Sequence, residues 1–128
     1  MRLLGIDYGT KRVGIAVSDV SGKMAFPHSV LKNDASLLEE IGYIVDEYEV
    51  QKIVIGHSLN KDMSPNSVQS DIETLMTDIT LEWGLSVHLQ SELFSTQAAL
   101  RIQGRNAATD ASAAALILDA FIQSNNPN

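Results

Sequence analysis

Residues 2–18 read RLLGIDYGTKRVGIAVS, and this stretch decides the fold. Two runs rich in Val, Ile and Leu, residues 2–7 and 12–18, are separated by the short glycine-containing segment 8–11. This pattern is typical of two strands joined by a tight turn, so we expect a β-hairpin here. Asp7 stands at the end of the first run, where a buried strand enters the turn.

The pattern downstream of the hairpin predicts one more strand and then alternating helices and strands. Pro27 lies inside the third strand, which indicates an edge strand or a bulge because proline cannot donate to a ladder. The order βββαβαβαα predicts an α/β fold, a five-stranded mixed sheet flanked by helices. The expected segments are a strand at 23–32, a helix at 37–48, a strand at 52–56, a helix from Ser64-Pro65 to Gly84, a strand at 85–89, and helices at 94–103 and 107–123.

The size and composition of the chain indicate one globular domain. We expect a single domain over residues 1–124 and a frayed tail at 125–128, because 128 residues leave no room for a second domain of ordinary size. The absence of cysteine excludes disulfides, thiol nucleophiles and cysteine-bound metals. No apolar run approaches the ~20 residues of a membrane span, and no signal peptide is visible. A cytoplasmic location is therefore expected.

The net charge of −7 argues, taken alone, against a nucleic-acid partner. Ten of the sixteen acidic residues, however, lie in segments 33–51 and 64–84, which contain no Lys or Arg. Acidic helix faces that maintain solubility explain this distribution. The rest of the chain has nine basic residues against six acidic ones, so a local basic surface stays possible.

Three carboxylates are expected at one edge of the sheet. Asp7 ends the first strand, Glu92 follows the last strand, and Asp110 begins the terminal helix. Converging carboxylates suit two Mg²⁺ or Mn²⁺ ions, which can position a water and stabilise the leaving oxygen of a phosphodiester. The alternatives are structural: Asp110 as a helix N-cap, and Glu92 as an acid favoured in the first turn of a helix.

Several polar residues near this edge are candidates for holding a nucleic acid. Lys11 and Arg12, which follow Thr10 in the hairpin, lie where they can contact phosphate oxygens. Asn60, after the fourth strand, can orient a phosphate or a water. All four also fit as ordinary turn residues without a function.

Four segments, in order, resemble the YqgF/RuvX family of Holliday junction resolvases and pre-16S rRNA nucleases, within the ribonuclease H-like superfamily. The resemblance covers nearly the whole chain and implies a ribonuclease H-like fold and a metal-dependent nuclease with ligands at Asp7, Glu92 and Asp110. The similar segments are DYGTKRVG at 7–14, IVIG at 53–56 with SLN at 58–60, SELFST at 91–96, and DASAAALIL at 110–118.

The chain departs from the family pattern in three places. Ser91 and Leu93 stand where the family has aspartate and arginine, and His57-Ser58 replaces leucine-proline. The loop before the final aspartate, Lys/Arg-rich in the family, offers Arg101 and Arg105 here. Fewer phosphate contacts predict weaker and more salt-sensitive binding, or a different substrate.

Processing of the 5′ end of pre-16S rRNA is the expected function, by a monomer or weak homodimer. Two alternatives stay open: a Holliday junction resolvase, which would act as a dimer, and a catalytically degenerate nucleic-acid-binding homologue. The D-x-G-T pattern also opens the phosphate-binding hairpin of actin-like ATPases and sugar kinases. Those proteins close two such domains over a nucleotide, and this chain has room for one.

Overall fold

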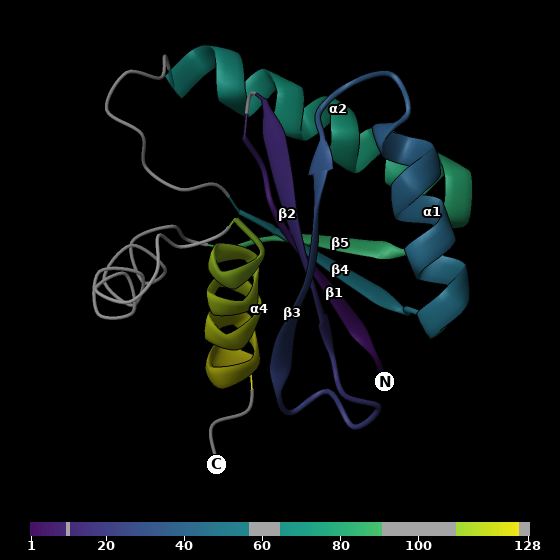
Figure 1. Ribbon diagram of the computed structural model, residues 1–128, viewed down its shortest axis with the longest axis vertical. Coiled ribbons are helices and arrows are strands. Elements are labelled where there is room, and N and C mark those ends of the chain that lie inside the picture. Colours follow the sequence, from purple (N-terminus) through teal and green to yellow (C-terminus); the bar gives the residue numbers. More distant parts are fainter. Residues whose placement is uncertain (10, 57–64, 91–109, 126–128) are drawn as a thin grey trace.

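The structure, a computed structural model, describes residues 1–9, 11–56, 65–90 and 110–125 (Figure 1). The side chains of residues 65–69, 110–112 and 124–125 lie outside this description. The described elements follow the predicted order, and the helix expected at 94–103 lies outside the described residues. They are β1 (Leu3–Asp7), β2 (Arg12–Ser18), β3 (Ala25–Lys32), α1 (Leu37–Tyr48), β4 (Lys52–Gly56), α2 (Pro65–Trp83), β5 (Ser86–Leu89) and α4 (Asp110–Asn125).

The five strands form one mixed sheet in the order β3-β2-β1-β4-β5. The β1–β2 and β2–β3 pairs are antiparallel, whereas β4 runs parallel to both β1 and β5. This arrangement confirms the predicted hairpin and the predicted five-stranded α/β sheet. It also places the carboxyl ends of β1, β4 and β5 at one edge of the sheet.

Strand β3 is an edge strand with an irregular register, as Pro27 predicted. Ile15 lies opposite Ser29 while the next residue, Ala16, lies opposite Pro27, so His28 is an extra residue on β3. A bulge at this place accommodates the missing N–H of proline. The strand begins at Ala25 rather than at residue 23, because the N–H groups of Lys23 and Met24 donate to the Asp19 carboxylate instead.

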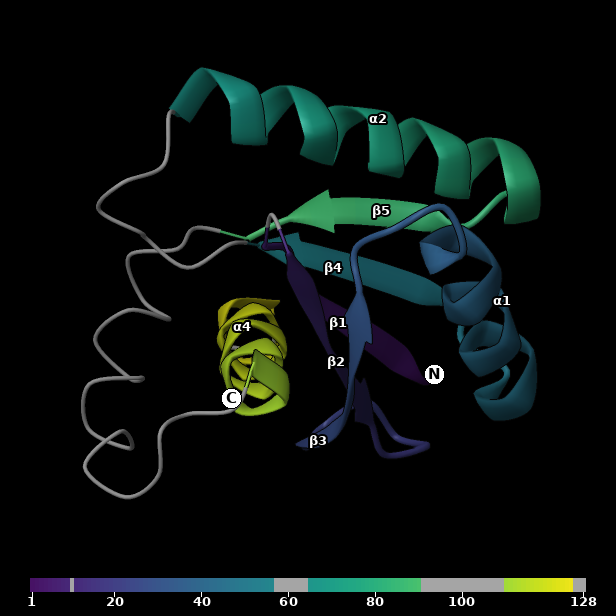
Figure 2. The ribbon, with the colours of Figure 1, turned by 45° about the horizontal axis from the view of Figure 1, so that its top comes forward.

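Helices cover both faces of the sheet (Figure 2). Helices α1 and α2 pack on one face, where their buried Ile41, Ile72 and Ile79 join Leu4 and Ile6 of β1 in a core cluster. Helix α4 packs on the other face in a second cluster, which contains Leu3, Ala16, Val54, Ala114, Ile117, Leu118, Phe121 and Ile122.

Helix α4 continues to Asn125, two residues beyond the predicted end at residue 123. The chain holds no glycine or proline between Asp110 and Asn125, and the first helix breaker is Pro127. Residues 107–109 and 126–128, the outer parts of the predicted helix and tail, lie outside the described residues. None of the helices in the described part of the chain has both the length and the apolar character needed to cross a bilayer.

Candidate active site

Asp7 ends β1 and is buried, with 5% of its surface exposed. The next residue, Tyr8, donates its backbone N–H to the carbonyl of Gly56 at 2.8 Å, which ties the exit of β1 to the end of β4. Burying a carboxylate costs free energy unless hydrogen bonds or a counter-charge stabilise it. A carboxylate buried at this position does not serve solubility.

The alternation of side chains along β1 sets the direction of Asp7. Leu3 belongs to the cluster under α4, and a Cβ placed on Gly5 would touch α4. Since residues 3, 5 and 7 of a strand share a face, the carboxylate of Asp7 lies on the α4 side of the sheet. Leu4 and Ile6 alternate with them and pack under α1 and α2.

Glycines stand on both sides of Asp7 in the sheet. Gly14 of β2 and Gly56 of β4 are its partners in the antiparallel and parallel pairs. Neighbours directly across a sheet share a face, and glycine presents no side chain there. At Gly56 the side chain of Ile117 of α4 takes this place, since a Cβ there would lie 3.1 Å from two of its carbons. Glycine at position 56 thus lets α4 pack closely beside Asp7.

Helix α4 approaches this face closely and runs antiparallel to β1. A Cβ on Gly5 would lie 2.8 Å from Cβ of Leu118 and 3.0 Å from the carbonyl oxygen of Ala114. Farther from Asp7, the later residues Phe121 and Ile122 border a cavity with Leu3. The amino end of α4, which begins at Asp110, therefore points to the edge of the sheet where Asp7 lies.

Gln90, the last described residue before Glu92, and the backbone at the start of α4 lie at the same edge of the sheet. The backbone of Asp110 is described but its side chain is not, and Glu92 lies outside the described residues. The N–H of Gln90 donates to the carbonyl of Ile55 at 2.9 Å, so the chain leaves the sheet beside β4 two residues before Glu92. Within the described part of the chain, no three His, Asp or Glu side chains form a metal-binding group.

The predicted phosphate-binding residues are described in part. Lys11 and Arg12 are exposed, and Arg12 is the first residue of β2. Both lie immediately after the turn that follows Asp7. Thr10, Asn60, Arg101 and Arg105 lie outside the described residues.

Sequence reasoning missed Asn33, which holds the turn after Asp7 in place. Its Nδ2 donates to the carbonyl of Gly9 at 2.7 Å, and its backbone N–H donates to the carbonyl of Lys11 at 3.0 Å. Asn33 is 24 residues from Gly9 in the sequence. Its only sequence signal is that of a turn-forming asparagine after a strand, so the contact becomes visible only in the fold.

Asp34 and Ser36 precede α1. Ser36 stands at the N-cap position, but its hydroxyl donates to Oδ1 of Asp34 at 2.7 Å, and no side-chain bond caps the helix. Hydrogen bonds from the hydroxyl and then the backbone N–H of Ser36 lower the pKa of Asp34, and the charge of Lys32 adds to this effect. Asp34 therefore stays ionised beside the hairpin.

Two cavities lie close to the sheet ends and have different surroundings. One of about 350 Å³ adjoins Tyr8 and Asn33 on the α1–α2 face, and Asp34, Asp71 and Asp78 line it. Its acidic lining is unsuited to phosphate groups.

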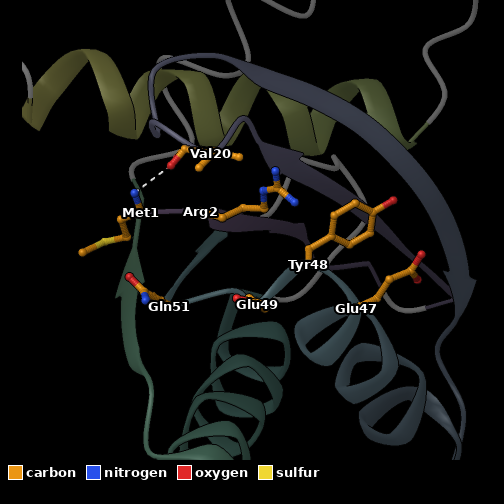
Figure 3. A pocket seen from close by; sticks show the side chains of 7 residues that line it. All are labelled: Met1, Arg2, Val20, Glu47, Tyr48, Glu49 and Gln51. Carbon is orange, nitrogen blue, oxygen red and sulfur yellow. Dashed lines mark hydrogen bonds between the residues drawn. The ribbon is translucent and has the colours of Figure 1, made fainter.

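The other cavity, of about 360 Å³, lies at the amino end of β1, opposite to the edge of Asp7 (Figure 3). There the guanidinium carbon of Arg2 lies 5.4 Å from the centre of the Tyr48 ring. Glu47 and Glu49 also line this cavity, and the described site residues Asp7, Lys11 and Arg12 do not.

Comparisons with known proteins agree on one family. The family model described as "RuvX: Holliday junction resolvase" matches residues 1–124. A protein of Oleidesulfovibrio alaskensis with the name "Putative pre-16S rRNA nuclease" is 31% identical over 132 residues, covering 95% of this chain and 92% of that protein.

Two solved structures are similar in fold. RuvC of T. thermophilus, in complex with a Holliday junction substrate, has a TM-score of 0.64 at 16% identity and covers 97% of this chain and 94% of its own. The ROK hexokinase from Thermus thermophilus has a TM-score of 0.50 at 18% identity and covers 86% of this chain but 39% of its own. At such identities each likeness shows the fold alone. Because the family match spans nearly the whole chain and the most similar fold of the two is that of RuvC, the chain belongs to the RuvX family and has a ribonuclease H-like fold.

Proposed function

We propose that this protein is a metal-dependent nuclease that hydrolyses phosphodiester bonds, and that its substrate is the 5′ end of pre-16S rRNA. The observation that carries the proposal is the buried Asp7 at the carboxyl end of β1, facing the side of the sheet on which the amino end of α4 approaches. Relatives that carry the name "Putative pre-16S rRNA nuclease" support this choice of substrate. A ribosomal RNA substrate implies a cytoplasmic location.

The candidate ligands fit divalent ions. Nucleases of the RuvC and ribonuclease H-like type generally use divalent metal ions. Asp7, Glu92 and Asp110 would supply carboxylate oxygens, the ligands that Mg²⁺ and Mn²⁺ prefer. Two such ions would polarise the phosphodiester and lower the pKa of the attacking water.

The other residues of the edge would hold the substrate rather than react with it. Lys11 and Arg12 lie beside the exit of β1 and carry the charge needed to bind phosphate oxygens. Thr10, Asn60, Arg101 and Arg105 are proposed to add contacts to the backbone of the nucleic acid. The burial of Asp7 strengthens electrostatic interactions at the reacting phosphate because less water screens them.

A Holliday junction resolvase is the second candidate, favoured by the description of the matching family. Such an enzyme cuts two strands symmetrically and would need a dimer. Trimming of a single RNA end can be done by a monomer, and a monomer or weak homodimer is what we propose. The sparse basic residues of the chain favour the RNA substrate over a large four-way duplex.

Cleavage assays with Mg²⁺ or Mn²⁺ test the proposal on two substrates, a single-stranded RNA that carries the 5′ flank of 16S rRNA and a synthetic four-way DNA junction. Wild-type protein is expected to cleave the RNA. Asp7→Asn should reduce the rate at least about 100-fold, since even loss of a group that supports a metal ligand costs about 10–100-fold. Asp46→Asn, an exposed change of the same kind on α1, is the matched control.

Each outcome discriminates between the candidates. Cleavage of the junction but not of the RNA would favour the resolvase. Binding of either substrate without cleavage would favour the degenerate homologue. Equal rates for Asp7→Asn and wild type would remove Asp7 from the mechanism.

A further inference from the structure

Two of the nine basic residues lie directly opposite each other on β2 and on the outer strand β3. Arg12 of β2 and Lys32 of β3 are partners in the antiparallel register, and both are exposed. Directly opposite side chains of an antiparallel pair are neighbours, and like charges in this arrangement destabilise a sheet. Together the two side chains present two positive charges, which suit the binding of an anion such as a phosphate.

The pair lies on the same face of the sheet as Asp7. Arg12 is two residues before Gly14, which is the partner of Asp7 in β2, so Arg12 shares the α4 side with both. Lys32 is opposite Arg12 and lies on that side too. Two strand spacings and a two-residue offset place Cα of Lys32 about 12 Å from Cα of Asp7.

The end of β3 is fixed relative to the hairpin turn. Asn33, the residue after Lys32, donates hydrogen bonds to the carbonyls of Gly9 and Lys11. These bonds hold Lys32 beside Lys11 and Arg12, so three exposed cations gather within two strands of Asp7. Because the backbone of the cluster is fixed before a phosphate binds, only the side chains have to be ordered on binding.

The opposite face of the sheet repels nucleic acid. Helices α1 and α2 carry their carboxylates there, and the groove beside Tyr8 is lined by Asp34, Asp71 and Asp78. A polyanion is therefore directed to the other face and to the β2–β3 edge. Asp34 lies two residues from Lys32 and interacts with its charge, while the carboxylate of Asp34 also accepts hydrogen bonds from Ser36.

We propose that Lys32, acting with Arg12, binds a backbone phosphate of the substrate one or two nucleotides from the cleaved bond and so guides the strand across β2 and β3. The proposal rests on the nuclease function above and adds Lys32 to the substrate-binding residues. Arg12 supplies a planar donor fork, and Lys32 supplies a point charge to the same phosphate.

Binding of a fluorescent single-stranded RNA to wild-type protein and to Lys32→Gln, without divalent metal so that no cleavage occurs, tests the proposal. Loss of one phosphate contact should lower the slope of log K against log salt by about 0.7 and weaken binding about five-fold at 0.1 M salt. Lys23→Gln, which removes the same charge in the exposed turn before β3, is the matched control and should bind like wild type.

Thermal unfolding separates a binding role from a structural one. Lys32→Gln removes both the like-charge neighbour of Arg12 and the attraction to Asp34, and because these two effects oppose each other its Tm should stay close to that of wild type. A lower Tm together with weaker binding would indicate a structural role and overturn the proposal. Equal salt slopes for Lys32→Gln and wild type, or an equal loss in Lys23→Gln, would also overturn it.

The binding and cleavage results together show which of the two proposals fails. If wild-type protein binds and cleaves RNA and Lys32→Gln binds RNA as tightly as wild type, only the role of Lys32 is wrong. If wild-type protein binds neither RNA nor junction, both proposals fail.

Discussion

The carboxylate of Asp19 organises the turn between β2 and β3, at the end of the sheet away from Asp7. It accepts hydrogen bonds from the hydroxyl of Ser21 at 2.6 Å and from the N–H groups of Lys23 and Met24 at 2.8 and 3.0 Å. The bond from Ser21 and then the two backbone bonds lower the pKa of Asp19 well below its ordinary value of 3.8. The ionised form is thus the one that the fold stabilises.

This shift makes stability depend on pH in the acid range. Because the pKa of Asp19 is lower in the folded chain than in the unfolded chain, its stabilisation is complete above pH 3.8 and is lost as the pH falls toward the folded pKa. Asp19→Asn should therefore flatten the fall of unfolding free energy between about pH 5 and pH 2, measured by urea unfolding. Ser21→Ala should give an intermediate slope because it removes the largest cause of the shift. If the unfolding free energy of Asp19→Asn falls with pH as steeply as that of wild type, Asp19 is not the source of the pH dependence.

Single residues were predictable where their neighbours in the sequence define their setting. Asp7 was identified because a carboxylate follows a buried strand, and the structure places it at the carboxyl end of β1. Asn33 and Lys32 were missed, since their partners Gly9 and Arg12 are about 20 residues away and are brought close by the pairing of β2 with β3. The roles proposed for Glu92, Asn60, Arg101 and Arg105 stay predictions.

Helix α4 is the element that determines whether Asp110 can reach Asp7. Its close contact with β1 depends on Gly5, where a Cβ would lie 2.8 Å from Cβ of Leu118. Cβ and a backbone carbonyl cannot move aside as the end of a flexible side chain can. Any larger residue at position 5 must therefore displace the helix from the sheet.

Gly5→Ala should lower the free energy of unfolding by about 1–3 kcal/mol, the usual cost of overpacking a core, measured by urea unfolding. It should also lower the cleavage rate of the folded protein, because the amino end of α4 moves relative to Asp7. Gly84→Ala is the control for crowding: apart from its neighbours in the chain, no described atom lies within 4 Å of a Cβ placed there, so its φ of +66° imposes backbone strain alone. Unchanged stability in Gly5→Ala would contradict the tight contact of α4 with β1.

The elements were predictable because their signals are local. Hydrophobic periodicity separates the helices from the strands, Pro27 marks the edge strand, and Gly84, with a φ of +66°, ends α2. The ends of elements were less certain: β3 starts at Ala25 because Asp19 binds the two preceding N–H groups. Whether these N–H groups bond to the neighbouring strand or to the side chain of Asp19 depends on contacts in the folded chain. The hydrophobic pattern of the sequence does not contain this information.

The whole molecule separates its charges between the two faces of the sheet. The acidic segments 33–51 and 64–84 contain α1 and α2, which lie on one face, while Lys11, Arg12 and Lys32 gather at the edge near Asp7. The charge distribution along the sequence indicated acidic helices, but it could not show that both helices cover the same face. The strand order β3-β2-β1-β4-β5 produces this separation.

The central claim is that Asp7, Glu92 and Asp110, from three distant parts of the chain, share divalent ions. The most direct measurement is a crystal structure of the wild-type protein with Mn²⁺, with the metal located by its anomalous scattering. We expect an anomalous peak of Mn²⁺ on the α4 side of β1, within about 2.0–2.5 Å of carboxylate oxygens of all three residues. A peak that contacts none of them, or a Glu92 or Asp110 carboxylate directed away from Asp7, would contradict it.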